Sequence, residues 1–354
     1  LVVNGVTFTV SNGQTVTSAT VVNDGEIYVM SGGTIVDTVV EDSSVALIDV
    51  GGTAAATTLA NNGYQDVYGT ASSTVVEPGG TEYVFGASFG AVVAGGVQYV
   101  GNSYAPYSDG TLVDDQGTQV VYVSGVAAVT EVNSGGTQTV DAGGLAVGTA
   151  LSGGIETVEL GGTTSGTMIY EGTLLMSGGV ASGTVVGGGL FVASGGTASA
   201  TTVDRGGTLQ VSTDAVARGV TVDRGGTLEV SARGTVSGAN LDGGVLTMGG
   251  GAVFEEYTRL TMVRAAELIL GQDSLYSFQG TIRDFGGQDF IDFATLRFTA
   301  ATTETFTKAI GASGILQVEH GSRVADLNFA GTYTTANFAL QSDGAHGTLV
   351  TFVP

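Results

Sequence analysis

The sequence predicts an all-β chain, built as a parallel β-solenoid of about 12 or 13 coils and closed by a C-terminal β cap module. Three observations support this fold class. Gly-Gly pairs recur along the chain as far as residue 251. Val, Thr, Ile and Leu dominate between the glycines, and these residues favour strands. Long stretches with helical periodicity are absent from the sequence.

Residues 1–252 form the repeat array. Its clearest copy is Thr202–Leu209, which reappears 19 residues later as Thr221–Leu228. A fixed period of about 20 residues is typical of a solenoid whose coils stack on their neighbours. Glycine supplies the positive φ that tight corners need, and Asn or Asp tolerates it next best. The Gly-Gly pairs are therefore interpreted as corners and not as a phosphate-binding motif, which would need a helix after it.

The array has one long interruption. No Gly-Gly pair occurs between Gly96 and Gly135, and the segment 102–110 contains Tyr104, Pro106 and Tyr107. We expect a loop insertion near 97–134, where recognition residues could lie on a rigid scaffold.

Residues 253–354 differ in composition from the array. Phe, both histidines and most of the basic residues occur here, and the Gly-Gly rhythm stops apart from Gly286-Gly287. Alternating apolar residues in 266–270 and 347–353 indicate strands. We predict a β module that caps the solenoid, because an open strand edge invites aggregation.

The charge distribution excludes several classes of partner. The formal net charge is −23, and residues 1–204 carry 18 acidic side chains with no Lys or Arg. Nucleic-acid binding requires basic residues, so we expect no nucleic-acid partner. No run of 18 apolar residues occurs, which predicts no membrane span in this chain. The absence of Cys fits an extracellular protein that stays unfolded during export, when a disulfide would hinder it.

The repeat also resembles a known family. Its form, Val-x-Ser-Gly-Gly-Thr-x-x-x-Thr-x-Val-x-x-Gly-Gly, is similar to the AIDA-like repeats of bacterial autotransporter adhesins, and the likeness runs from about Val21 to Gly251. The resemblance implies a right-handed parallel β-helix, located extracellularly or on the outer-membrane surface of a Gram-negative bacterium. It also implies heptose glycosylation of serines before Gly-Gly, for which the candidates are Ser31, Ser134, Ser177 and Ser194.

The C-terminal segment is similar to a module found in large secreted proteobacterial surface proteins. The strings that carry this likeness are Leu327-x-Phe329-x-Gly331-x-Tyr333 and Gly347-Thr348-Leu349-Val350-Thr351. Together the two resemblances imply a non-enzymatic adhesin that acts in self-association, biofilm formation or attachment to surface glycans and proteins. The alternatives are a structural filament or surface-layer subunit and, from a different class, a β-helical polysaccharide-degrading enzyme.

Aromatic residues are the leading candidates for a binding surface. Tyr64, Tyr83 and Tyr99 are 19 and 16 residues apart, close to one coil, so we expect them to stack as a stripe. Tyrosine offers an apolar ring and a polar tip to a sugar or a protein. The candidate binding residues are Tyr64, Tyr83, Tyr99, Tyr104, Tyr107 and Tyr122.

Catalytic and metal-binding residues are harder to find. Lyases with a β-helical fold generally need a cationic group, which residues 1–204 lack. The only adjacent Asp pair, Asp114-Asp115, would point to opposite faces of a strand. We predict no enzyme activity and no cofactor. Calcium is the one metal considered, with Asp289 and Asp292, or Asp114 and Asp115, as ligands alongside carbonyl groups.

Overall fold

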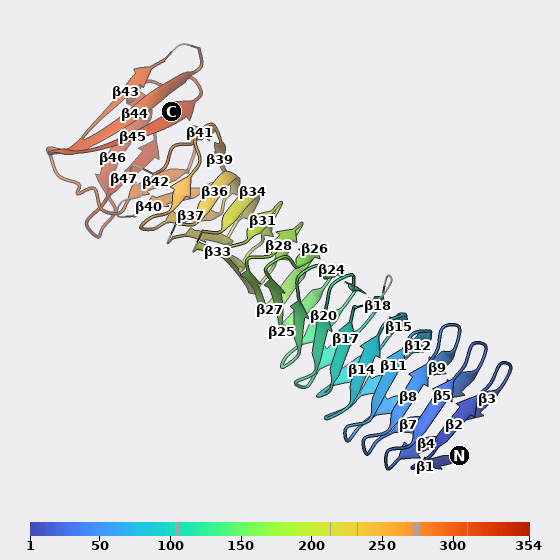
Figure 1. Cartoon of the computed structure of the whole chain (residues 1–354). Helices are drawn as coiled ribbons and strands as arrows, with labels where there is room; N and C mark the ends of the chain where they lie inside the picture. Colours follow the sequence, from blue (N-terminus) through green and yellow to red (C-terminus); the bar gives the residue numbers. More distant parts are fainter. Residues whose placement is uncertain (103–105, 213, 232, 272–276, 310) are drawn as a thin grey trace. The chain divides into compact units, whose positions relative to one another are not determined.

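The computed structural model describes residues 1–102, 106–212, 214–231, 233–271, 277–309 and 311–354. It confirms the predicted class: the chain is an all-β parallel solenoid of about 15 turns with additional C-terminal strands. The described chain divides into two compact units, Leu1–Ala181 and Ser182–Pro354. Figure 1 labels the strands of each unit.

The Leu1–Ala181 unit has three columns of parallel strands, and each turn contributes one strand to each column. The first column comprises β2 (Thr7–Val10), β5 (Glu26–Val29), β8 (Val45–Ile48), β11 (Tyr64–Val67), β14 (Thr81–Val84), β17 (Val97–Val100), β20 (Thr118–Val121) and β23 (Thr137–Val140). The second comprises β3 (Thr15–Thr17), β6 (Thr34–Val36), β9 (Thr53–Ala55), β12 (Thr70–Ser72), β15 (Ala87–Phe89), β18 (Tyr107–Asp109), β21 (Val126–Ala128), β24 (Leu145–Val147) and β26 (Thr163–Ser165).

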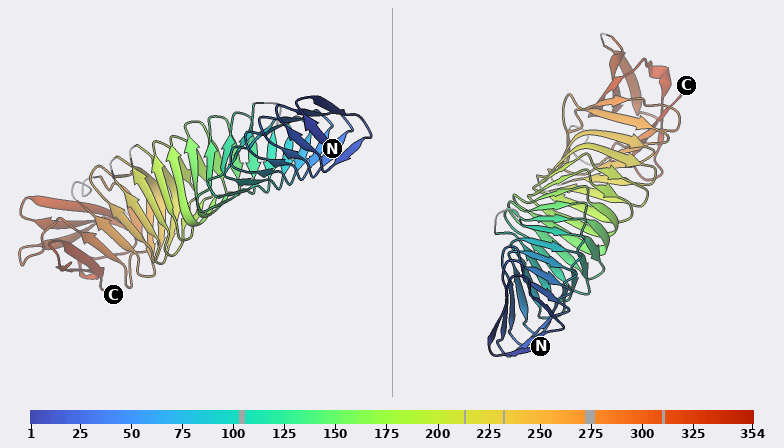
Figure 2. Two further views of the ribbon diagram at one scale, coloured as in Figure 1. Left: turned by 90° about the horizontal axis from the view of Figure 1, so that it is seen from below. Right: turned by 90° about the vertical axis from the view of Figure 1, so that its right-hand side faces the viewer.

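The third column of this unit comprises β1 (Val2–Asn4), β4 (Thr20–Val22), β7 (Val39–Val40), β10 (Thr58–Leu59), β13 (Val75–Val76), β16 (Val92–Ala94), β19 (Leu112–Asp114) and β22 (Glu131–Asn133). Two longer strands, β25 (Ala150–Glu159) and β27 (Met168–Ser177), run through the third column and into the first. Figure 2 shows these turns, blue to green, stacked one on the next.

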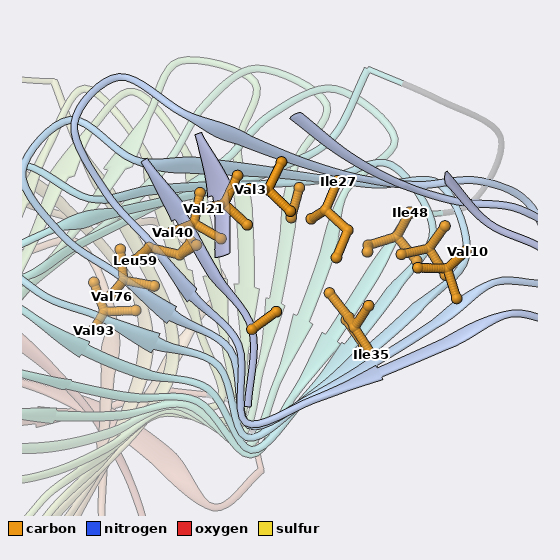
Figure 3. Close-up of a cluster of buried hydrophobic side chains, with 14 residues drawn as sticks. Val3, Val10, Val21, Ile27, Ile35, Val40, Ile48, Leu59, Val76 and Val93 are labelled. Carbon is orange, nitrogen blue, oxygen red and sulfur yellow. The ribbon is translucent and has the colours of Figure 1, made fainter. Parts of the chain in front are cut away.

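The core of this unit comes from the alternation of its strands. Inward positions repeat from turn to turn and are fully buried, and Figure 3 shows one such column as a row of Val3, Val21, Val40, Leu59, Val76 and Val93. The side chain period of two in a strand turns the intervening residues outward. Interior composition and surface chemistry are therefore set by alternate letters of the sequence.

The Gly-Gly corners combine two different requirements. Gly32 has φ +76, a conformation that other residues rarely adopt. Gly33 lacks a positive φ, but a Cβ at this position would lie 2.5 Å from the carbonyl oxygen of Val10 in the preceding turn. The first glycine of a pair thus makes the turn, and the second allows adjacent turns to approach closely.

The loop insertion predicted near 97–134 is wrong for most of its length. Six regular strands, β17 to β22, occupy this segment. Its corners lack Gly-Gly because Asp115, Gln116 and Ser124 adopt positive φ instead, each followed within two residues by a glycine. Only the turn from Gln98 to Gln119 is lengthened, to 21 residues against 16 for the turn before it.

The Ser182–Pro354 unit begins with further parallel turns. Their strands are β29 (Val185–Val186), β30 (Leu190–Ser194), β31 (Thr197–Ser199), β32 (Thr202–Val203), β33 (Thr208–Ser212), β34 (Val216–Asp223), β35 (Thr227–Val230), β36 (Thr235–Asp242), β37 (Val245–Met248), β38 (Val253–Phe254), β39 (Arg259–Val263), β40 (Glu267–Leu270), β41 (Thr281–Arg283) and β42 (Phe290–Phe293). A further strand, β28 (Val180–Ser182), contains the boundary between the units.

Parallel pairing continues past residue 252, since β37 pairs with β40 and β40 with β42. The boundary predicted at 252/253 therefore does not mark a change of strand pairing. The total of about 15 turns is above the predicted 12 or 13. Their corners keep positive φ at Tyr257, Arg264 and Ala265 without Gly-Gly, so the sequence signal fades while the structure persists.

The chain closes with antiparallel strands: β43 (Thr303–Lys308), β44 (Ser313–His320), β45 (Arg323–Ala330), β46 (Phe338–Ser342) and β47 (Thr348–Phe352), with a short 3-10 helix, η2 (Thr335–Asn337), before β46. β45 pairs with β41, and β47 pairs antiparallel with β42. The open edges of two last-turn strands are thus occupied, which protects them from pairing with another chain.

Candidate binding surface

Five aromatic side chains form a continuous stack on the Leu1–Ala181 unit. The ring centroids of Tyr68 and Phe85 are 4.8 Å apart, those of Phe85 and Tyr83 are 6.3 Å apart, those of Tyr83 and Tyr99 are 5.2 Å apart, and those of Tyr99 and Tyr122 are 5.6 Å apart. The planes of each pair lie within 18° of parallel. We call these five residues the aromatic stack.

Strand register explains the centre of the aromatic stack. Tyr83 in β14 pairs directly with Tyr99 in β17, and both lie two residues before a corner on the outward face of their strands. Adjacent parallel strands are about 4.8 Å apart, which matches the stacking distance of aromatic rings. Successive turns therefore impose the geometry on the rings.

The end of the stack depends on a glycine. Tyr122 follows β20, at the position that Gly101 holds one turn earlier, and a Cβ on Gly101 would lie 2.5 Å from Cβ of Tyr122. The missing side chain leaves room for Tyr122 beside the Tyr99 ring. A repeat with any other residue at 101 would break the stack at this turn.

The aromatic stack is accessible and slightly hollowed. Tyr68 is 43% exposed and Tyr83 is 36% exposed. A hollow of about 400 Å³ is lined by Tyr83, Phe85, Tyr99, Gly101, Asn102 and Tyr122. A second hollow of about 240 Å³ is lined by Asn62, Tyr64, Gly79, Thr81 and Tyr83. Tyr83 borders both hollows, so the two form one extended surface around its ring.

The charged residues around the aromatic stack are acidic. Partial burial raises the pKa of the Tyr83 hydroxyl, and neighbouring Tyr99 and Asp66 raise it further. Burial likewise raises the pKa of Tyr122, together with Tyr99 and Asp141. Both phenols therefore stay neutral and can donate a hydrogen bond. No Lys or Arg occurs in residues 1–181 to offset the acidic groups.

The other predicted tyrosines behave differently. Tyr64 was expected to stack with Tyr83, but it pairs with Thr81, because the turn between them has 17 residues and not 19. Tyr107 lies on another strand column, where its ring meets Phe89 edge-on at 6.2 Å. Tyr104 lies outside the described residues. Tyr83, Tyr99 and Tyr122 are thus the members of the predicted set that the structure brings together.

The predicted calcium ligands mostly have structural partners. Asp289 accepts hydrogen bonds from the backbone amides of Ala266 at 2.8 Å and Gly286 at 3.1 Å. Asp114 accepts one from the amide of Asp115 at its own corner. Burial and the charge of Asp343 raise the pKa of Asp292 to about 6. Across the described ranges, no group of three or more acidic or histidine side chains is placed to hold a metal ion.

The serines before Gly-Gly lie at corners. Ser31, Ser134 and Ser177 are exposed, and Ser194 is half-buried at the end of β30. A hypothetical Cβ on Gly51 would lie 2.6 Å from Ser31 Oγ, so this hydroxyl packs against the next corner in its column. The four serines do not form one cluster.

Sequence reasoning missed a buried polar column inside the Leu1–Ala181 unit. Six fully buried side chains follow one another at the same inward position of the first strand column, namely Gln65, Glu82, Gln98, Gln119, Gln138 and Glu156. We call them the glutamine ladder. A signal existed, because each of the six stands two residues after a corner glycine.

Hydrogen bonds along the glutamine ladder have a direction. Gln138 Nε2 donates to Gln119 Oε1 at 2.6 Å, and Gln119 donates to Gln98 at 2.7 Å. Gln98 then donates to Glu82 Oε2 at 2.7 Å. Gln65 donates to Glu82 from the other side at 3.4 Å. Glu82 thus accepts hydrogen bonds from the glutamines on both sides of it, although burial raises its pKa.

Glu156 lies at the far end of the glutamine ladder. Its Oε2 accepts a hydrogen bond from Thr167 at 3.0 Å, while Oε1 is buried with no hydrogen-bond partner among the described residues. Burial raises the pKa of Glu156 to about 7. The residue is therefore close to half protonated at neutral pH.

The Ser182–Pro354 unit carries a charged surface of its own. A hollow of about 550 Å³ is lined by Asp204, Asp223 and Asp242 and by Arg205, Arg224 and Arg264. We call it the Asp–Arg slot. Asp204-Arg205 and Asp223-Arg224 repeat one turn apart in the slot, and Asp242 and Arg264, which form an ion pair at 2.8 Å, extend this alternation of charges. Burial, with the charges of Asp204 and Asp242, raises the pKa of Asp223.

No helix in the described part of the chain is long and apolar enough to cross a membrane.

Comparison with known proteins assigns the chain to a family. Residues 189–244 match the model described as "Adhesin of bacterial autotransporter system, probable stalk". The crystal structure of the TibC-catalyzed hyper-glycosylated TibA55-350 fragment superimposes with a TM-score of 0.65 at 31% sequence identity, covering 72% of this chain and 93% of that one. A search of curated proteins finds no match. The chain therefore belongs to the AIDA-type family of bacterial autotransporter adhesins, whose passengers are surface-exposed or secreted in Gram-negative bacteria.

Proposed function

We propose that this chain is a non-enzymatic adhesin passenger at the outer-membrane surface, and that the aromatic stack is its main contact surface in self-association and biofilm formation. The observation that supports this proposal is a run of five stacked rings on a strand scaffold, of which Tyr68 and Tyr83 are exposed and the other three are half-buried. Aromatic side chains dominate the energetics of protein interfaces, since they bury much apolar area at little entropic cost.

The aromatic stack could also bind a surface glycan. Tyrosine offers an apolar ring and a polar tip to a sugar as well as to a protein, so a surface glycan is the competing occupant of the aromatic stack. No cofactor is proposed. The described acidic groups either cap corners or lack a third ligand nearby, as at Asp289 and Asp114.

Sedimentation velocity over a range of concentrations tests the proposal. The wild-type chain is expected to form dimers and larger species, and Tyr83→Ser with Tyr99→Ser is expected to weaken association by about tenfold, the effect of losing one interface hot spot. Tyr170→Ser is the matched control, because Tyr170 is 57% exposed but lies outside the aromatic stack. A wild-type chain that stays monomeric and cleaves a polysaccharide would contradict the proposal.

Glycosylation is proposed for the corner serines because the TibA fragment is described as hyper-glycosylated. Ser31, Ser134 and Ser177 are exposed on the corners, and Ser194 is less accessible. Intact-mass measurement of the exported protein is expected to show sugar additions, and replacement of Ser31, Ser134 and Ser177 by Ala is expected to remove part of them. An unchanged mass distribution would assign any modification to other residues.

A further inference from the structure

The glutamine ladder begins at Gln65 with an unsatisfied oxygen. Gln65 Nε2 donates to Glu82 Oε1 at 3.4 Å, so the amide nitrogen of Gln65 faces the turn of Glu82. Gln65 Oε1 then faces the preceding turn, in which Ala46 pairs with Gln65. Gln98 shows the same division, since its nitrogen and its oxygen bond to opposite turns. Gln65 Oε1 is buried, and it has no hydrogen-bond partner among the described residues.

A buried hydroxyl faces the same place from another strand column. Thr57 follows Ala46 by eleven residues, which is the separation at which Thr149 donates to Gln138. The hydroxyl of Thr57 is therefore directed at the position that a glutamine side chain would occupy at residue 46. Thr57 is fully buried, and its Oγ1 has no partner within the described ranges. A donor and an acceptor thus converge on a place where residue 46 supplies only a methyl group.

The turn that contains Ala46 also has spare volume. Compared with Gln65 in the next turn, Ala46 lacks the four side-chain atoms beyond Cβ. Ile48 and Leu59, both labelled in Figure 3, each add only one carbon to the valines that hold their positions in the next turn. Space for about two non-hydrogen atoms remains, which is enough for one water molecule and too little for a larger ligand.

Other turns show that a buried hydroxyl alone does not make this site. Thr38 and Thr184 are also buried without a hydrogen-bond partner in the part of the chain that the structure describes. At the position equivalent to Ala46, their turns carry Ile27 and Leu174. These larger side chains extend into the space that Ala46 leaves open. Only the turn of Ala46 therefore combines spare volume with a facing donor and acceptor.

The ligand that fits this site is neutral. Gln65 Oε1 and Thr57 Oγ1 are uncharged, and Glu82, one turn beyond Gln65, already accepts hydrogen bonds from Gln65, Gln98 and Ser88. A cation at this depth would be buried without a counter-charge, which is costly. A water molecule can both accept and donate, and buried water typically makes about three hydrogen bonds.

We propose that an ordered water molecule lies beside Ala46, where it accepts a hydrogen bond from Thr57 and donates one to Gln65 Oε1. The water takes the place of the amide that glutamine supplies in later turns, and it extends the polar column of the interior by one turn. Every side chain of the site is fully buried, so the water exchanges with solvent only when neighbouring turns separate.

Nuclear magnetic resonance of the full chain, labelled at its Ala and Thr methyl groups, detects the water directly. Nuclear Overhauser transfer from water is expected at the methyl groups of Ala46 and Thr57. The methyl group of Thr184 is the matched control, because its hydroxyl is equally buried while Leu174 fills the space beside it. Absence of transfer at Ala46, or equal transfer at Thr184, overturns the proposal.

Two substitutions of similar size at residue 46 provide a second measurement. Ala46→Gln places an amide where the water lies, so the water signal at Thr57 is expected to disappear while the midpoint of urea unfolding stays the same or rises. Ala46→Leu displaces the water without replacing its hydrogen bonds, so the midpoint is expected to fall. Leucine itself fits this column, as Leu174 shows.

The direction of the Ala46→Leu effect separates a hydrated site from a dry one. In a dry site leucine would fill unoccupied space and stabilise the fold. A midpoint of Ala46→Leu at or above that of the wild type therefore overturns the proposal. If Ala46→Leu does not fold, the methyl measurement on the wild-type chain decides between the two.

Discussion

A single buried carboxyl group shows how strongly this interior constrains its residues. Glu156 has no counter-charge nearby, and one of its oxygens has no hydrogen-bond partner among the described residues. A carboxylate in such a place loses its hydration without compensation, so its protonated form is favoured. The pKa of about 7 means that the native state binds a proton that the unfolded chain releases near pH 4.5.

This linkage predicts a pH-dependent stability. Between about pH 4.5 and pH 7 the folded state holds more protons than the unfolded state, so the free energy of unfolding falls as pH rises. The full loss above pH 7 is about 3 kcal/mol by the usual conversion from pKa to free energy. Glu156→Gln cannot ionise and is expected to abolish this part of the pH dependence, so that the variant exceeds the wild type in stability at pH 8.

Denaturant midpoints at pH 5 and pH 8 provide the measurement. Glu171→Gln is the control, because it removes one charge from an exposed position of the same unit. Equal pH dependence in Glu156→Gln and wild type would show that Glu156 is hydrated and ionised in the folded protein.

At the scale of the element, the glutamine ladder links successive strands, and the hydrogen bonds of each glutamine depend on the glutamines of the neighbouring strands. Gln119 donates to Gln98 and accepts from both Gln138 and Thr130. Removal of one rung leaves several buried polar groups without partners, which costs about 1–3 kcal/mol for each. The same positions in the adjacent turns of the same column are apolar, as at Ala46 and Leu174, so packing alone does not require an amide here.

Gln119→Leu is therefore expected to destabilise the protein by about 3 kcal/mol or more, even though it adds an apolar side chain to the core. Gln341→Leu, at an exposed position of β46, is expected to change stability by less than about 0.5 kcal/mol. Urea unfolding of both variants measures the difference. A Gln119→Leu variant as stable as the wild type would mean that the ladder relaxes around the gap.

The sequence predicted the parallel solenoid and its glycine corners, and the aromatic stack in part. Gly-Gly corners and alternation determine strand positions, because they act locally through φ and burial. The pairing of Tyr83 with Tyr99 follows from a spacing of 16 residues, and the mismatch of Tyr64 follows from a 17-residue turn, which only the register of real strands reveals. The corners at Asp115 and Tyr257 could not be predicted from the glycine pattern, because residues other than glycine adopt positive φ there.

At the scale of the whole molecule, charge governs solubility. Hydrophobic residues make up 42% of the chain, and the net charge is −23 with a pI near 4.1. Mutual repulsion of the carboxylates keeps such chains apart, and the repulsion disappears as they protonate. The protein is expected to show a sharp solubility minimum near pH 4 and to redissolve above pH 6.

Turbidity between pH 3.5 and pH 8 tests this expectation. Far-ultraviolet circular dichroism of the redissolved protein should match that of the untreated sample, because the interior carboxyls tolerate acid: burial raises the pKa values of Glu82 and Glu156. Loss of the β signal on return to pH 8 would show that acid unfolds the chain and does not merely neutralise its surface.

The direction of the glutamine ladder has a consequence for how successive turns are added. Gln98, Gln119 and Gln138 each donate to the preceding turn, so such a turn completes its hydrogen bonds only if its glutamine lies directly over the polar residue of the turn before. A shift of one residue would reverse the faces of the strand, bury Tyr99 or Asp66 and leave an amide outside. Valine columns would accept many neighbours equally well. The ladder thus favours the correct strand register as each turn folds onto the one before it, in a chain whose other repeats are nearly alike in sequence.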